Sequence, residues 1–263
     1  MIEYFLYFVF GVCIGSFANV CIYRLPLNKN LLFPFSYCPH CNTQIKFYQN
    51  IPIISYLFLK GVSSCCNNKI SIRYPIVESF IGISFIFIYH IYSENTYNVI
   101  FISLLTLGIV IIFFTDLEHF IIPNQISYTL SFLAIILSLL NLHPFIKSFY
   151  EVLIGGMVSG LILYITAKLY LILRKKEGMG MGDVKMITMI GLWLGLQNTI
   201  IIIVLSSIIG ALLGIVLILL KKIKNDQLIP FGSFLSISTL LIIIMSSFYD
   251  LNLFFFYLKN MSP

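Results

Sequence analysis

Two aspartates stand at the ends of apolar segments: Asp116 in "IIFFTDLEHFIIPN" and Asp183 in "EGMGMGDVKM". The chain has only ten acidic residues, and an ionisable side chain beside hydrocarbon marks a functional site by default. Two neighbouring carboxylates can share one proton, because like charges at short range do not both ionise readily. One can then activate water as a base while the other protonates a carbonyl or a leaving amine. The alternative is a pair of solvated helix-end aspartates, which suits Asp183 near a helix N-terminus.

Three glycines precede Asp183 at alternate positions: Gly178, Gly180 and Gly182. Glycine adopts dihedral angles that other residues avoid, and it lets another backbone approach closely. A helix cap needs one polar residue, whereas a docking surface for an extended peptide needs open space. The spacing therefore predicts that the glycines make room beside Asp183 for a partner and a substrate.

Four of the six cysteines lie in one basic loop. Cys38 and Cys41 form a CxxC knuckle, which is half of a typical zinc site, and Cys65 and Cys66 could supply the other half. The other two cysteines fall inside the first apolar segment, where small apolar packing residues are expected.

The composition identifies the setting of these residues. The chain is 59% hydrophobic and only 10% charged, whereas soluble domains carry about 25% charged residues. These values predict an all-α polytopic membrane protein. The net charge of +6 is better explained by basic loops on the inner side of a membrane than by nucleic acid binding.

Eight segments are long and apolar enough to be membrane spans, since a helix needs about 20 residues to cross the hydrocarbon. They cover roughly residues 4–23, 75–92, 98–115, 124–141, 151–173, 183–197, 199–220 and 230–249. The sixth is short, and the later stretch "LNLFFFYL" is too short to cross and is expected at the interface. The first reads as a retained span and not as a cleaved signal peptide.

Most of the 16 lysines and arginines lie in three loops. These loops run from Arg24 to Arg73, from Arg174 to Lys185 and from Lys221 to Lys224. Eight spans place all three loops on one side, the cytoplasmic side, and both termini on the other. Asp116 and Asp183 are then expected at the same, cytoplasmic boundary.

The predicted division is a first part at 1–74, with the first span and the cysteine loop, and a multi-span part at 75–263. The region 25–74 is too small to build much of a core without a staple such as a metal ion.

Several of these motifs together resemble the type IV prepilin peptidases. "GMGMGDVKM" is similar to the GxGD signature of membrane aspartic proteases. "TDLEHFIIPN" is similar to the first catalytic motif of the type IV prepilin peptidases. Further similar stretches occur in order over most of the chain: "GSFANVCIYRLP", "CPHC", "NIPIISYLFLKG", "ISIRYPIVE" and "PFGSFL".

The resemblance implies a bifunctional enzyme of the bacterial cytoplasmic (inner) membrane. It would cleave the basic leader of prepilins or pseudopilins after a glycine at the cytoplasmic face, and then methylate the new N-terminus with S-adenosylmethionine. Asp116 and Asp183 would be the catalytic pair, with Gly180, Gly182 and Pro123 as supporting motif residues and no metal ion in proteolysis. The implied partners are the substrate and the bilayer, with no nucleic acid.

The cysteine loop departs from the family pattern, in which a second CxxC usually precedes the "ISxRYP" stretch. Here Cys66 matches the last position of that pair, Ser63 replaces its first cysteine, and Cys65 is displaced by two residues. Three interpretations stay open. They are zinc held by Cys38, Cys41, Cys66 and either Cys65 or His40, a loop without metal, and a disulfide.

Other functional classes are also open. A transporter would carry acidic residues in its spans, but usually near the bilayer midplane in interrupted helices. A related GxGD peptidase without methyltransferase activity would lack the cysteine loop and the N-terminal motif. A membrane scaffold would keep its function after both aspartates are replaced by asparagine.

Overall fold

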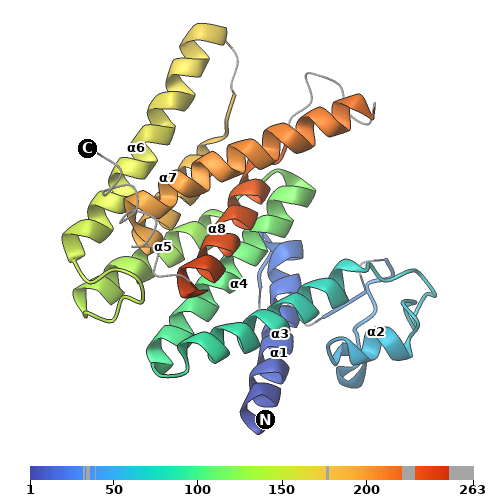
Figure 1. Cartoon of the computed structure of the whole chain (residues 1–263). Coiled ribbons are helices and arrows are strands. Elements are labelled where there is room, and N and C mark those ends of the chain that lie inside the picture. Colours follow the sequence, from blue (N-terminus) through green and yellow to red (C-terminus); the bar gives the residue numbers. More distant parts are fainter. Residues whose placement is uncertain (32, 34–35, 39, 176–177, 221–228, 249–263) are drawn as a thin grey trace. The chain divides into compact units, whose positions relative to one another are not determined.

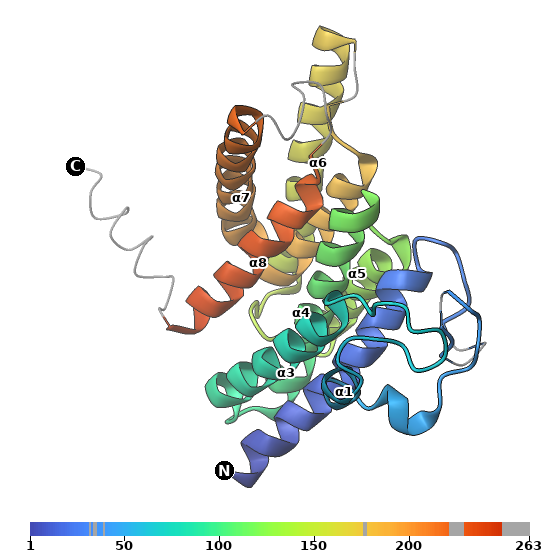
Figure 2. The same cartoon turned by 90° about the vertical axis from the view of Figure 1, so that its right-hand side faces the viewer.

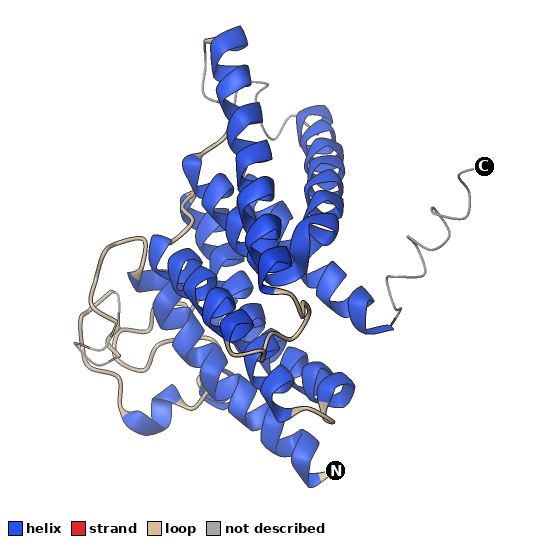
Figure 3. Ribbon diagram, turned by 90° about the vertical axis from the view of Figure 1, so that its left-hand side faces the viewer, coloured by secondary structure: helices blue, strands red, loops and turns tan. Residues whose placement is uncertain are grey.

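The computed structural model describes residues 1–31, 33, 36–38, 40–175, 178–220 and 229–248. Over these residues the regular secondary structure is helical, and the chain forms no strand apart from the isolated bridges Tyr37–Gln44 and Val62–Lys69 (Figure 3). The predicted all-α class is confirmed. Lys176, the basic loop 221–224 and the apolar stretch 251–258 lie outside the described residues.

The described helices follow the predicted spans closely. They are α1 (Ile2–Arg24), the 3-10 helix η1 (Phe47–Asn50), α2 (Ile54–Phe58), α3 (Arg73–Tyr92), α4 (Thr96–His119), α5 (Asn124–Leu139), α6 (Phe149–Arg174), α7 (Met181–Leu219) and α8 (Phe231–Phe248) (Figure 1). Five of them, α1, α3, α4, α6 and α7, are long and apolar enough to cross a membrane, and α5 and α8 contain shorter apolar helices. The chain is therefore a multi-pass membrane protein.

Helix α7 contains two of the predicted spans. Its 39 residues would extend about 58 Å if straight, roughly twice the thickness of the hydrocarbon core. The helical geometry breaks at Gly195, where φ is 78° and ψ is 169°. Only glycine adopts these angles without strain, so the chain changes direction there. The predicted junction at residue 198 is three residues later than the observed break.

The chain divides into two compact units, Met1–Thr115 and Asp116–Pro263, and α4 passes from one to the other. In the first unit α1 packs on α3. A Cβ atom at Gly11 would lie 2.9 Å from Cα of Gly82, and one at Gly15 would lie 2.8 Å from Cα of Glu78. Small residues at these positions let the two backbones come together, as in other membrane helix pairs.

In the second unit α7 is the central helix, with α5, α6 and α8 packed on it (Figure 2). The part of α7 before the break contacts α6, where Gly155 lies against Gly191. It also contacts α5, because Nε1 of the buried Trp193 donates to the carbonyl oxygen of Leu130 over 3.0 Å. The part after the break contacts α8, where the Ser206 hydroxyl donates to the carbonyl oxygen of Phe234.

The contact between α6 and α7 leads to a prediction about stability. A Cβ atom at Gly155 would lie 2.5 Å from the carbonyl oxygen of Gly191 and 3.0 Å from Cα of Gly195. Gly155→Ala should therefore lower the free energy of unfolding by about 1–3 kcal/mol, which is typical of overpacking. Thermal unfolding in detergent micelles measures the change. The control is Met157→Ala on the exposed side of the same helix, and equal melting temperatures for the two variants would contradict the prediction.

Candidate functional site

Asp116 and Asp183 are brought together within the second unit. Asp116 lies in the last turn of α4, three residues before its end at His119, and Asp183 lies in the first turn of α7. Both residues are buried, with 5% and 8% of their surface exposed. The charge on Asp116 acts electrostatically on Asp183. Two residues that are 67 positions apart, on two different helices, therefore lie close enough to interact electrostatically.

The start of α7 fixes the side chain of Asp183. Gly180 is the N-cap residue, and its N–H group donates to Oδ2 of Asp183 over 3.2 Å. The N–H group of Asp183 donates in return to the carbonyl oxygen of Gly180 over 3.1 Å. The carboxylate of Asp183 thus makes one half of a capping box, and the second bond is a backbone turn, because Gly180 has no side chain to complete the box.

Two of the three glycines before Asp183 are closely approached by a neighbour, and none of the three has an unusual dihedral angle. Among the described glycines only Gly61 and Gly195 have a positive φ. A Cβ atom at Gly178 would overlap the ring of Tyr170, and one at Gly182 would lie 3.2 Å from Ile122. Gly180 differs, because its nearest neighbour on that side, the carboxylate of Asp183, is 3.6 Å away. A Cβ atom would therefore fit at Gly180 in ordinary van der Waals contact, and the lack of a side chain is required only at Gly178 and Gly182 of these three.

Helix α8 provides the partner of Asp116. Oδ2 of Asp116 accepts hydrogen bonds from the N–H group of Ser233 over 2.6 Å and from its hydroxyl over 3.0 Å. Ser233 lies in the first turn of α8, where N–H groups have no partner within the helix. The neighbouring Gly232 leaves room for this contact, because a Cβ atom there would lie 3.0 Å from Cγ of Asp116.

Ser233 is a site residue that our sequence analysis did not identify. The only signal was its place in "PFGSFL", one of the stretches that resemble the family. The hydrogen bond to Asp116 joins residues 117 positions apart, which no local pattern reveals.

Pro123, the predicted supporting residue, is the N-cap of α5, and its carbonyl oxygen accepts from the N–H group of Ser127 over 3.2 Å. The preceding Ile122 is the direct link to the carboxylates. It packs beside Gly182, and its Cδ1 would be 2.8 Å from a Cβ atom at Gly232. The loop between α4 and α5 thus packs between the first turn of α7, which contains Asp183, and the first turn of α8, which binds Asp116.

Lys185, near the start of α7, makes its contacts with α5. Nζ of Lys185 donates to Oδ1 of Asn124 over 2.9 Å and lies 5.5 Å from the ring centroid of Tyr128. These contacts fix a positive charge two residues after Asp183. The side chain of Lys185 therefore joins the first turns of α7 to the first turns of α5.

The second candidate site is the cysteine cluster of the first unit, which two similar turns build. The N–H group of Cys38 donates to the carbonyl oxygen of Thr43, and that of Asn42 donates to Cys38. Ser63 makes the equivalent bonds with Asn68 and Asn67. Ser63 thus takes the place in the second turn that Cys38 has in the first.

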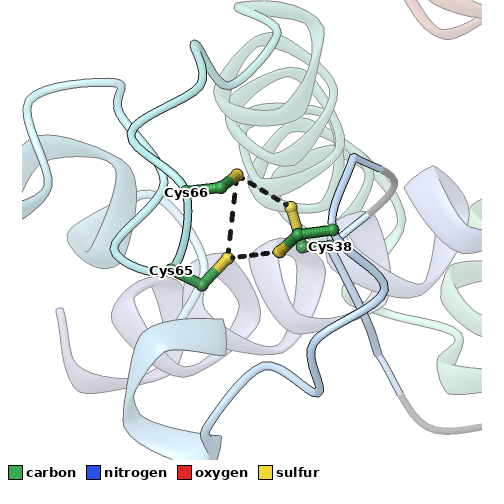
Figure 4. Close-up of side chains that lie close together, drawn as sticks. Cys38, Cys65 and Cys66 are labelled. Atoms are coloured by element: carbon green, nitrogen blue, oxygen red, sulfur yellow. Dashed lines mark hydrogen bonds between the residues drawn. The ribbon is translucent and has the colours of Figure 1, made fainter.

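The missing thiol comes from a neighbouring position. Sγ of Cys65 lies 3.1 Å from that of Cys41 and 3.9 Å from that of Cys66, and Sγ of Cys38 lies 3.6 Å from that of Cys66. All four sulfur atoms lie within 4.8 Å of one another, and those of Cys38, Cys65 and Cys66 converge in Figure 4. Sulfur atoms in tetrahedral zinc coordination are about 3.8 Å apart, given Zn–S bonds of about 2.3 Å. The four cysteines fit zinc, and His40 is not part of the cluster.

The surroundings of Cys38 favour the form that binds a metal. Burial disfavours its thiolate, but the N–H groups of Cys41 and His40 and the side chains of Ser63 and Cys66 outweigh this effect and lower the pKa of Cys38 to about 6. The thiolate is the metal ligand. Its neighbours therefore stabilise the form of Cys38 that binds a metal.

The cluster predicts a metal content of one zinc ion per chain for the purified protein. Cys65→Ser should lose most of the zinc, because it removes one of four thiolates. His40→Ala should keep it. Mass spectrometry of the metal content measures both, with Cys13→Ser in α1 as a cysteine control outside the cluster. Retention of zinc by Cys65→Ser, or its loss from His40→Ala, would contradict this ligand set.

Comparison with known proteins gives matches along most of the chain. The model of the bacterial peptidase A24 N-terminal domain matches residues 9–92, and that of the type IV leader peptidase family matches residues 101–215. No solved structure matches the chain.

Several curated proteins are similar to the chain, and each is called prepilin leader peptidase/N-methyltransferase. The protein of Stutzerimonas stutzeri is 34% identical over 88% of this chain and 86% of its own length. That of Aeromonas hydrophila is 35% identical over 89% and 87%, respectively. That of Legionella pneumophila is 32% identical over 90% and 91%.

Proposed function

The chain belongs to the type IV leader peptidase family, and on this premise we propose that Asp116 and Asp183 are the catalytic pair of a prepilin peptidase that also methylates its product. The observation that carries the proposal is the buried carboxylate pair, built from two helix ends and held by backbone and hydroxyl donors. Two solvated helix-end aspartates would not need this burial. The transporter alternative has no support, since the family is a peptidase family.

The pair supplies an acid and a base for peptide hydrolysis. One carboxylate takes a proton from water as the water oxygen bonds to the scissile carbonyl carbon. The other carboxyl group donates a proton, and the carbon–nitrogen bond then breaks to release the new amine. The roles of acid and base cannot be assigned to one aspartate each, because two coupled carboxyl groups titrate as a pair. Ser233 and the N–H group of Gly180 hold the carboxylates in place during this exchange.

The substrate in this proposal is a prepilin or pseudopilin, whose apolar helix follows a short basic leader. Apolar side chains are exposed next to the carboxylates: Leu117 and Phe120 after Asp116, and Met181 before Asp183. A helical substrate in the bilayer could pack on such a surface, as other apolar helices do. We place the site at the cytoplasmic face of the bacterial inner membrane, because the adjacent loops are basic.

Methylation of the new N-terminus is the second activity, and we assign it to the part at 1–74. The new N-terminus is an ammonium group, which must lose one proton before its nitrogen can attack. S-adenosylmethionine, when bound, would supply the methyl group, with its sulfur–methyl bond broken as the nitrogen–carbon bond forms and a neutral thioether as the leaving group. Zinc held by Cys38, Cys41, Cys65 and Cys66 would join two turns of a loop that has little core of its own.

Replacement of either aspartate tests the protease. Asp116→Asn and Asp183→Asn should each reduce cleavage of a membrane-embedded prepilin by at least about a thousandfold, because each removes an acid–base group. The gel shift of the cleaved product measures the rate. Glu118→Gln, on the exposed carboxylate two residues after Asp116, is the matched control and should cleave normally. Cleavage by a folded variant of either aspartate would refute the pair.

Replacement of Ser233 tests how Asp116 is held. Ser233→Ala removes the hydroxyl donor and keeps the backbone donor, so kcat should fall about tenfold, within the range for hydrogen bonds to charged groups. KM and the melting temperature should change little. The control is Ser238→Ala, which removes a buried hydroxyl without a hydrogen-bond partner from the same helix. Equal kcat values for the two variants would show that the Ser233 hydroxyl does not position Asp116.

A further inference from the structure

The first unit contains a cavity of about 530 Å³ between α1 and the loop that follows it. One wall is a single face of α1, formed by residues at helical spacing: Cys13, Ser16, Phe17, Val20 and Arg24. The other wall is the loop, with Leu31, Ser36, Phe47, Asn50, Ile51 and Pro52. The volume lies within the range of about 300–1,000 Å³ that is usual for small-molecule sites.

A buried carboxylate fixes the loop wall. Oε2 of Glu78 in α3 accepts a hydrogen bond of 2.7 Å from the N–H group of Ile53, and the hydroxyl of Ser16 also donates to Glu78. Ile53 has a φ of 59°, which is a strained conformation for a β-branched residue. Strain of this kind persists only where the surroundings impose it, and it is concentrated at ligand sites. Glu78 thus joins α3, α1 and the loop at the edge of the cavity.

The lining carries separate groups that suit the parts of a nucleoside. Phe47 is 91% exposed, so packing within the protein does not explain its ring, whereas an aromatic face can stack on a purine. The amide of Asn50 and the hydroxyls of Ser16 and Ser36 offer donors and acceptors for a base edge and a ribose. The guanidinium of Arg24 is buried and held by the carbonyl oxygens of Asn30 and Leu31. It places a positive charge where a carboxylate could lie.

We propose that this cavity binds S-adenosylmethionine, with its adenine on Phe47, its ribose and base edges near Asn50 and Ser36, and its carboxylate near Arg24. The inference rests on the proposed methyltransferase activity and assigns its donor site. The peptide acceptor is a poorer fit, because an apolar helix has one amine to recognise and would leave the dispersed polar groups without partners.

Donor binding by the full-length enzyme in nanodiscs tests the proposal without any turnover. Isothermal titration with S-adenosylmethionine, in the absence of prepilin, should give a dissociation constant that rises at least about tenfold in Phe47→Ala and in Asn50→Ala, as expected for lost base stacking and a lost polar contact. The matched controls are the neighbouring Tyr48→Ala and Gln49→Ala, which do not line the cavity. Tyr48 is also an exposed aromatic side chain, with 60% of its surface accessible. Both controls should bind the donor as the wild type does.

The variant Phe47→Leu separates stacking from insertion into lipid. It keeps an apolar side chain and loses the aromatic face, so donor affinity should fall as it does in Phe47→Ala. If Phe47→Leu and Asn50→Ala bind the donor normally while the wild type binds and methylates, the donor lies elsewhere and the proposal is wrong. If the wild type cleaves prepilin but neither binds the donor nor methylates, the methyltransferase function and the proposal both fail. Donor binding without cleavage would refute the protease function and leave the cavity assignment standing.

Discussion

A carboxylate beside hydrocarbon must accept hydrogen bonds, because an ionised group without partners is too costly to bury. Much of the second unit follows from this constraint. The first turn of a helix has N–H groups to spare, and the structure uses two such turns. The start of α7 supplies the donor for Asp183 and the start of α8 supplies those for Asp116. Three helix ends must therefore meet at one point, and glycines at positions 182 and 232 let them do so.

The first unit meets the same constraint with less regular structure. The loop between α1 and α3 has almost no apolar core, so its shape depends on a few hydrogen bonds between residues distant in the sequence. The Glu78 carboxylate holds the turn at Ile53, and the amide of Asn19 donates to the carbonyl oxygen of Tyr74. The cysteine cluster joins the two turns further out. A few such interactions are sufficient to fix the loop, because the packing of α1 on α3 already holds its two ends together.

The sequence predicts those features that local chemistry decides. Apolar length reveals the spans, and residue type reveals Asp116, Asp183 and the cysteines. It does not show which residues a distant helix end will contact, so Ser233 was missed. The sequence also predicts the junction between the two spans of α7 three residues too late. The apolar run continues through Gly195, and only the dihedral angles mark the break. The glycines were identified as space-makers, but their neighbours Tyr170 and Ile122 could come only from tertiary packing.

The displaced cysteine shows that two CxxC pairs are not the only spacing that brings four sulfur atoms together in such a loop. Ser63 has taken the position of a thiol, yet four sulfur atoms still surround one centre because Cys65 reaches it from two residues further along the chain. The arrangement of the sulfur atoms in space is then independent of one particular spacing of cysteines along the sequence. A search for two CxxC pairs would overlook the cluster in this chain, because its fourth sulfur atom comes from a different position in the same turn.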